Sequence, residues 1–263
     1  MNKITKEGLL REMAVLSVDS KNLQLYVFDE IASTNQWLMD QPEHDGRVVC
    51  IANQQSEGRG REGRSWISQG GGVFMSFSYP LDSGMVNFSA ISLVMGLVVC
   101  RVLKAEGVEG VALKWPNDVL LNGSKLAGVL IEARRSKKQL SLVIGIGLNV
   151  ALKGGGADMT DFDWSDLSSQ GLGLDDRERL IVLILNEGEL AIHQYLQDGF
   201  ISLREEWMQC DAFAGKEVNV ISHGEIVLSG VESGVDESGM LQVLSNSEVV
   251  KVHSGDVSLR VKS

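Results

Sequence analysis

The sequence predicts an α+β protein in which a mixed β-sheet with packed helices is followed by a small all-β barrel. Up to about residue 212, short apolar runs that alternate as strands are interspersed with segments of helical periodicity. From Gly215 onward only short strands separated by turn residues follow. With 263 residues, 44% hydrophobic residues and only three prolines, the chain can form a folded body with a small appended domain.

The N-terminal part of the chain alternates helices and strands. Residues 4–16 have the periodicity of a short amphipathic helix. In the segment ASTNQWLMD, Ser33 or Thr34 is expected to cap a second helix, because a hydroxyl can accept from the free N–H groups of the first turn. The expected strands of this part are residues 23–28, 47–53 and 73–79.

The middle of the chain contains further helices and a series of strands with short turns. Helical periodicity runs from Phe88 to Glu106 and ends at Gly107, and two more helices are expected at 176–197 and 198–210. Arg134 to Lys138 form a basic hairpin tip. The expected strands are residues 111–114, 119–121, 126–133 and 139–150.

We expect three parts along the chain, divided where the sequence pattern changes. Residues 1–22 form an N-terminal helix and linker, residues 23–212 form the α+β body, and residues 213–263 form the barrel. The segment after Ala151 is rich in glycine, serine and aspartate, which is typical of a long loop within the body.

Charge and cysteine content exclude several classes of protein. The net charge of -11 argues against binding nucleic acid or anionic lipid over the whole surface. The longest apolar run, residues 90–100, is too short to span a membrane, and the N-terminus lacks the apolar core of a signal peptide. The three cysteines have no CxxC spacing and the four histidines have no metal-ligand spacing. These features predict a cytoplasmic protein with buried free thiols and no membrane or zinc site.

The segment GRGREGRSW (58–66), which continues to Gly72, concentrates three arginines, six glycines and a tryptophan in fifteen residues. A flexible linker and a single-strand nucleic-acid contact are the alternatives to a binding loop. Trp66 argues against the linker, and the acidic total charge argues against nucleic acid. Glycines allow backbone N–H groups to approach a ligand, and arginine offers bidentate donors, so the loop predicts a site for a small anion.

Two further segments carry polar groups in a strand setting. KWPND (114–118) places an amide and a carboxylate on a proline turn, and Lys125 begins the next strand. IGIGLN (144–149) lacks the third glycine of a dinucleotide fingerprint and ends a strand, so Gly145 and Gly147 are expected to floor a pocket. The sequence contains no P-loop motif.

The order of these motifs resembles that of the biotin protein ligases over nearly the whole chain. The resemblance rests on STN (33–35), QSEGRGREGRSW (55–66), KWPND (114–118), KLAG (125–128) and IGIGLN (144–149), with GDVSLR (255–260) near the usual C-terminal end.

The resemblance implies a fold and an activity. The fold would be that of the class II aminoacyl-tRNA synthetases and biotin ligases, with 23–212 as the catalytic domain and 213–263 as an SH3-like β-barrel. The activity would be a biotin–[biotin carboxyl carrier protein] ligase: biotin and ATP, with Mg²⁺, form biotinyl-5'-AMP and pyrophosphate, and biotin passes to one lysine of the carrier. The implied partner is the carrier subunit of acetyl-CoA carboxylase.

The same resemblance implies roles for individual residues, with Mg²⁺ brought by ATP and not held directly by the protein. The residues implied in catalysis are Arg61, Lys125 and Asp118. Those implied in biotin binding are Ser33, Thr34, Asn35, Gln55, Arg59, Gly60, Arg61 and Lys125. Those implied in ATP or adenylate binding are Arg64, Trp66, Lys114, Asn117, Asn149 and Trp164, with Trp164 on a loop that would cover the adenine.

The chain departs from the repressor members of the family at its N-terminus. Those members carry a DNA-binding helix-turn-helix of about 60 residues, whereas 32 residues precede Ser33 here. Either the protein is a ligase form without that domain, or this sequence begins inside a longer protein. In both cases we expect no DNA binding by this chain. A homodimer is compatible with the family, and the loop 58–72 is expected to be mobile until biotin or the adenylate orders it.

Two other functions remain open from the residues alone. A lipoate–protein ligase-like adenylating enzyme would share the fold and the chemistry, and a non-catalytic biotin or nucleotide sensor would share the binding residues. The presence of both Arg61 and Lys125 favours an enzyme over a sensor, because a neutral ring system can be bound without either positive charge.

Overall fold

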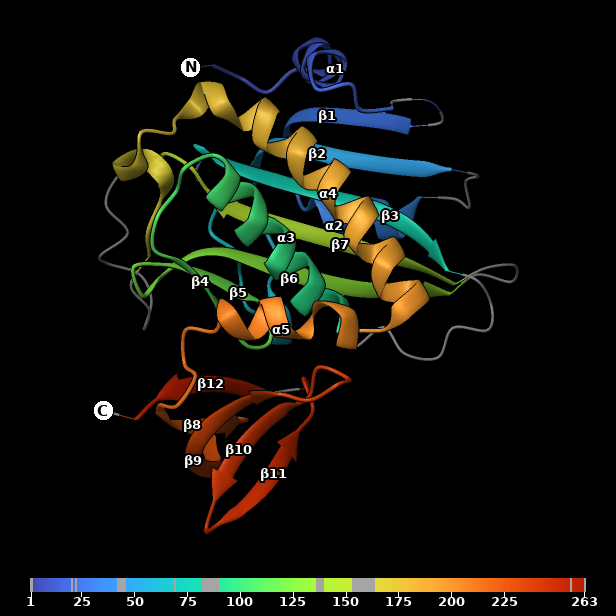
Figure 1. Ribbon diagram of the computed structural model, residues 1–263. Coiled ribbons are helices and arrows are strands. Elements are labelled where there is room, and N and C mark those ends of the chain that lie inside the picture. Colours follow the sequence, from blue (N-terminus) through green and yellow to red (C-terminus); the bar gives the residue numbers. More distant parts are fainter. Residues whose placement is uncertain are drawn as a thin grey trace. The chain divides into compact units, whose positions relative to one another are not determined.

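The structure, a computed structural model, is drawn in Figure 1 with its helices and strands labelled. It consists of two compact units, which are formed by residues 1–86 with 124–187 and by residues 87–123 with 188–263. The three parts expected from the sequence, 1–22, 23–212 and 213–263, remain a prediction. The described residues are 2–19, 21, 23–41, 46–68, 70–81, 90–135, 140–152, 164–255 and 257–262.

The first unit is built on a mixed sheet with the strand order β1-β2-β3-β7-β6. β1 pairs with β2 in parallel, whereas β2 with β3, β3 with β7, and β7 with β6 pair antiparallel. The sheet therefore confirms the mixed α+β class. The strands are β1 (Leu23–Ile31), β2 (Arg47–Gln55), β3 (Gly72–Leu81), β6 (Ser124–Arg135) and β7 (Leu140–Asn149).

The helices of the first unit pack on this sheet through apolar contacts. Leu38 of α2 is fully buried against β2 residues Val48 and Cys50 and against Val143 of β7. β3 is buried over its first seven residues, which explains its long apolar run. The helical elements are α1 (Lys6–Val15), α2 (Thr34–Asp40), η1 (Arg61–Gly63), η3 (Leu167–Gln170), η4 (Leu174–Asp176) and the first part of α4 (Arg177–Asp198).

The second unit contains the β4–β5 hairpin, two complete helices and a five-stranded antiparallel sheet with the order β11-β10-β9-β8-β12. Within this unit, Trp115 Nε1 donates to the Gly239 carbonyl oxygen at 3.1 Å, which ties the hairpin to the five-stranded sheet. The elements are α3 (Ile91–Ala105), β4 (Val111–Lys114), β5 (Asp118–Leu121), α5 (Ile201–Gln209), β8 (Glu217–Ser222), β9 (Glu225–Val235), β10 (Leu241–Ser245), β11 (Glu248–Val252) and β12 (Val257–Val261).

A few element bounds differ from the sequence prediction. The helix expected from residue 198 begins at Ile201, because Gly199 adopts a φ of 77° that ends α4. Arg134 and Arg135 of the expected basic tip belong to β6, and residues 136–138 lie outside the described residues. Residues 88–89 of the expected third helix, and residues 153–163 of the long loop, also lie outside them.

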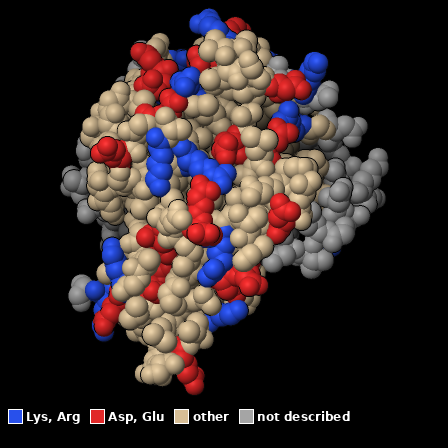
Figure 2. All heavy atoms as spheres, viewed as in Figure 1, with Lys and Arg blue, Asp and Glu red and all other residues tan. Residues whose placement is uncertain are grey.

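The surface carries both signs of charge. On the face shown in Figure 2, Lys and Arg side chains are interspersed with Asp and Glu side chains. No helix among the described residues is both long enough and apolar enough to cross a membrane.

A pair of carboxyl groups, Asp211 and the buried Glu232, lies where α5 is followed by the C-terminal sheet. Glu232 of β9 is 1% exposed, and its backbone N–H donates to the Lys216 carbonyl oxygen at 2.9 Å. Burial, followed by the hydrogen bond and charge of Asp211, raises the pKa of Glu232 to about 9. Burial also raises the pKa of Asp211. A protonated Glu232 can donate a hydrogen bond to Asp211. The two carboxyl groups therefore satisfy each other's hydrogen bonding as long as one of them is protonated.

Stability is therefore expected to fall as the pH rises. Glu232 has a folded pKa above its unfolded value, so its contribution is complete below about pH 4.5 and is lost as the pH approaches about 9. Between these values the free energy of unfolding should fall by up to about 1.4 kcal/mol per pH unit. Denaturant unfolding at about pH 6 and about pH 9 should show a smaller fall for Glu232→Gln than for wild type. The exposed Glu237→Gln serves as control, and an unchanged slope for Glu232→Gln would contradict the assignment.

Candidate functional site

The N-terminus of α2 carries a buried cluster of uncharged polar groups. Ser33 caps the helix, and its Oγ accepts from the Gln36 N–H at 3.4 Å. Gln55 Oε1 accepts from the Thr34 backbone N–H at 2.8 Å and lies 3.1 Å from Thr34 Oγ1. The structure thus brings the predicted residues 33–35 and Gln55 together. It adds Ser76 of β3, whose Oγ lies 2.7 Å from Thr34 Oγ1 and donates to Asn35 Oδ1 at 2.5 Å.

The arginine loop folds as a closed turn. The Trp66 backbone N–H donates to the Gly58 carbonyl oxygen at 2.8 Å, and the Gly60 N–H donates to the Arg64 carbonyl oxygen at 2.7 Å. Between them, η1 begins at Arg61, and Glu62 takes a φ of 57°. Arg64 pairs with Glu62 at 2.6 Å. The predicted residues Arg59 to Arg64 are thus held on one short hairpin.

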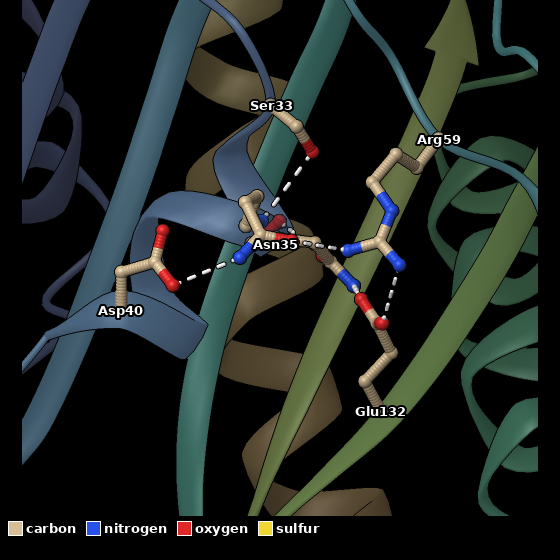
Figure 3. Close-up of polar contacts among 7 residues, drawn as sticks. Ser33, Asn35, Asp40, Arg59 and Glu132 are labelled. Carbon is tan, nitrogen blue, oxygen red and sulfur yellow. Dashed lines mark hydrogen bonds and ion pairs between the residues drawn. The ribbon is translucent and has the colours of Figure 1, made fainter.

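Arg59 connects this hairpin to the polar cluster through a glutamate of β6 (Figure 3). Its guanidinium donates to Gln36 Oε1 at 2.7 Å and pairs with Glu132 Oε1 at 3.0 Å. The other Glu132 oxygen accepts from Asn35 Nδ2 at 2.9 Å. Glu132 was not predicted from the sequence, although a carboxylate that ends the apolar run LAGVLIE is a signal that could have identified it.

Trp66 closes the loop against an aromatic and cationic cluster. Trp66 is 9% exposed, and its ring meets that of Trp164 edge-on with centroids 5.4 Å apart. Lys125 Nζ lies 5.5 Å from the Trp66 ring centroid and 5.8 Å from that of Trp164. Among the described residues, the buried Nε1 of Trp66 has no hydrogen-bond acceptor.

Three glycines on one face of the β6–β7 pair bring the two clusters side by side. Gly128 pairs with Gly147, and Gly145 lies two residues before Gly147 on the same face. A Cβ at Gly147 would lie 2.4 Å from the Trp66 ring, and a Cβ at Gly145 would lie 2.1 Å from Asn35 Oδ1. The glycines predicted to line a site are therefore needed so that Asn35 and Trp66 can lie close to the sheet.

The remaining predicted residues lie around these elements or in the other unit. Asn149 is 1% exposed, and its Nδ2 donates to the Ser165 carbonyl oxygen at 3.0 Å, next to Trp164. In the second unit, Lys114 Nζ and Asp118 Oδ2 lie 3.4 Å apart across the turn that contains Asn117. The structure therefore brings Lys114 and Asp118, which were predicted for different roles, into contact.

Comparison with known proteins is consistent with this geometry. Residues 27–149 match the model of the Biotin/lipoate A/B protein ligase family, and residues 213–260 match that of the Biotin protein ligase C terminal domain. The bifunctional ligase/repressor BirA of Escherichia coli is 33% identical over 89% of this chain and 73% of its own length. The biotin–[acetyl-CoA-carboxylase] ligase of Mycobacterium tuberculosis is 32% identical over 89% of this chain and 88% of its own.

A solved structure shows the same architecture. The biotin protein ligase of Aquifex aeolicus in complex with biotin and ATP has a TM-score of 0.79 and 29% identity, and the match covers 91% of this chain and 99% of that one.

Proposed function

The chain belongs to the biotin protein ligase family, and from this premise we propose how its described residues carry out the reaction. The protein is an ATP-dependent ligase that activates biotin as biotinyl-5'-AMP and transfers it to the biotin carboxyl carrier protein of acetyl-CoA carboxylase. Biotin and ATP are its substrates, as the complex of the Aquifex aeolicus relative supports.

One observation supports the assignment of the site: an uncharged polar cluster and a cationic aromatic cluster lie on the same glycine-lined face of the sheet. Asn35 lies against Gly145, and Trp66 with Lys125 lies against Gly147 and Gly128. Residues two apart on a strand are separated by about 7 Å, so a small ligand can contact both clusters. Biotin has an uncharged ureido ring at one end and a carboxylate at the other, which matches this polarity.

The uncharged cluster is assigned to the ureido ring. Ser33, Thr34, Asn35 and Gln55 supply hydroxyl and amide groups that can both donate and accept. Thr34 is bonded to Gln55, and Ser76 links Thr34 to Asn35, so little freedom of these side chains is lost on binding.

The cationic cluster is assigned to the carboxylate and the phosphates. Lys125 would contact the carboxylate and α-phosphate oxygens as they meet, which offsets the repulsion between two anions. Arg59, Gly60 and Arg61 would enclose the carboxylate and then the adenylate phosphate, and Arg64 would lie near the triphosphate. Closure of the loop 58–72 would exclude water from the mixed anhydride.

The remaining predicted residues are assigned to ATP or the adenylate by their resemblance to the family's motifs. Trp164 with Trp66 offers aromatic surface for the adenine, and Asn149 orients the segment that carries Trp164 through Ser165. Lys114 and Asn117 would contact the adenylate or its counter-ion. Asp118 would orient the incoming lysine, with Lys114 Nζ at 3.4 Å holding its carboxylate.

Mg²⁺ is proposed to enter with ATP. Among the described residues, no three His, Cys, Asp or Glu side chains form a group that could hold a metal ion. Mg²⁺ prefers oxygen ligands and retains water, so phosphate oxygens would supply most of its coordination. Bound there, it neutralises charge on the phosphates.

The cellular setting is also a proposal. We place the reaction in the cytoplasm, where carrier protein and ATP are available. The net charge of -11 and the interspersed charges of Figure 2 support the absence of DNA binding by this chain. A homodimer remains compatible with the fold.

The direct test measures transfer of biotin to a carrier domain, detected with streptavidin, in the presence of ATP and Mg²⁺. Lipoate in place of biotin tests the alternative ligase, and its use in preference to biotin would overturn the assignment. The match of residues 213–260 to the biotin protein ligase C terminal domain favours biotin. Binding of biotin without any transfer to the carrier domain would favour the alternative of a non-catalytic biotin sensor.

Glu132 is proposed as a residue that positions Asn35 and Arg59. Glu132→Ala should raise the KM for biotin about five- to tenfold with little change in kcat, because each partner loses a charge-assisted hydrogen bond. Glu132→Gln retains an acceptor and should restore part of the loss. The exposed Glu30→Ala, in the same sheet, is the control. A fall in kcat at unchanged KM would contradict this role.

A further inference from the structure

Two of the three cysteines, Cys100 and Cys210, lie in contact in the second unit, on different helices. Cys100 is on α3 and is 0% exposed, whereas Cys210 caps the C-terminus of α5 and is 8% exposed. The two thiols are joined by a side-chain hydrogen bond. Lys104, one helical turn beyond Cys100, places its Nζ 3.1 Å from Cys210 Sγ. None of these three residues is assigned to the ligase reaction.

The backbone around Cys210 is held in place. Its carbonyl oxygen accepts from the Leu113 N–H of β4 at 2.7 Å, and its N–H donates to the Trp207 carbonyl oxygen at 3.0 Å. One turn earlier, Glu206 pairs with Arg101 of α3 through distances of 2.7 and 2.5 Å. The two helices are thus fixed at the level of the two sulfur atoms.

The charges around the two sulfurs differ. The hydrogen bond from Cys100, together with Lys104, lowers the pKa of Cys210 to about 6, although burial and Glu206 oppose this shift. The hydrogen bond to Cys210, with burial, raises the pKa of Cys100. These shifts favour the thiolate form of Cys210 and the thiol form of Cys100, as expected of an attacking and a resolving cysteine. Cys50 offers a contrast, because burial raises its pKa to about 12.

We propose that Cys100 and Cys210 form a peroxide-sensitive dithiol, a modification site in which oxidation joins α3 to the C-terminal end of α5 through a disulfide bond. The oxidant is a small peroxide such as hydrogen peroxide.

The chemistry balances in two steps. The Cys210 thiolate attacks one peroxide oxygen, the O–O bond breaks, and the leaving hydroxide takes a proton as water, which leaves a sulfenic acid on Cys210. Cys100 sulfur then attacks Cys210 sulfur, the S–O bond breaks, and the hydroxyl leaves with the Cys100 proton as a second water. Two electrons pass from the two sulfurs to the peroxide, and Lys104 stabilises the starting thiolate.

The disulfide would constrain the segment that leads into the C-terminal sheet. Near the end of α5, Met208 Sδ accepts from the Val235 N–H of β9 at 3.3 Å, and Arg204 Nε donates to the Val235 carbonyl oxygen at 2.6 Å. A covalent bond from Cys210 to α3 therefore holds both α3 and β9 to the same helix.

The test treats the reduced 263-residue chain with dilute hydrogen peroxide, blocks the remaining thiols and maps the peptides without reduction. We expect a cross-linked peptide pair containing Cys100 and Cys210, while Cys50 remains a thiol. Lys104→Gln should form the disulfide about tenfold more slowly at neutral pH, because the thiolate fraction falls. The matched control is Lys6→Gln, an exposed helix lysine of the first unit, which should react like wild type.

Several outcomes would overturn the proposal. Oxygen added to Cys210 while Cys100 stays a thiol would show that the pair does not close. Equal oxidation of all three cysteines would show unfolding or non-selective access. Cys210→Ala keeps Cys50 and Cys100, so a disulfide formed by that variant would show that Cys210 is not required. Circular dichroism of each variant checks that it is folded.

Discussion

Replacing Lys125 with alanine is expected to reduce the rate of biotinyl-5'-AMP formation about 10²- to 10³-fold. The ammonium lies beside the Trp66 and Trp164 rings, in a setting where a charge is screened less than in water. The reaction brings a carboxylate against a phosphate, and no other lysine of the first unit is assigned to that contact. The measurement is the rate of pyrophosphate release in a single turnover with biotin and ATP.

The control separates catalysis from folding. Lys3→Ala removes an exposed lysine of the same unit that pairs with Asp29 at 2.7 Å, and it should leave the rate unchanged. Lys125→Arg should not restore the rate fully, because a planar guanidinium does not reproduce the ammonium contacts. Normal adenylate formation by folded Lys125→Ala would contradict the assignment.

The elements of the fold follow largely from local patterns in the sequence. β1, β2, β3 and β7 lie where alternation or apolar runs predict them, and Ser33 caps α2 because its hydroxyl is followed directly by a helical pattern. The change to short strands after Gly215 likewise predicts the five-stranded sheet. These features depend on residues that are close together in the sequence, so they can be predicted from one sequence alone.

The partners within the site depend on contacts between distant residues. Asn35 and Glu132 are 97 residues apart, and their contact exists because β6 pairs with β7 in one particular register. A shift of one residue would turn Glu132 to the other face. Ser76 was missed for the same reason, since a serine in an apolar strand does not indicate what it faces. The motifs predicted which residues matter, whereas pairing of strands determines which of them touch.

Replacing Arg61 with glycine is expected to release the adenylate about 10- to 100-fold faster, because a charge-assisted hydrogen bond contributes about 1.5–3 kcal/mol. Activated biotin that leaves the site reacts with any exposed amine. The variant should therefore label a bystander protein that has no carrier domain, whereas wild type should not. Streptavidin detection on an equimolar mixture of carrier and bystander measures both reactions.

Arg64→Gly is the matched control, because it makes the same substitution three residues away on the same hairpin. Arg64 pairs with Glu62 at 2.6 Å and is assigned to the triphosphate, so its loss should slow activation without labelling the bystander. If added loop flexibility were the cause of leakage, both variants would leak alike, since each introduces one glycine into the turn closed by Gly58 and Trp66. Leakage from Arg61→Gly alone, reduced by Arg61→Lys, would assign retention to the charge at that position.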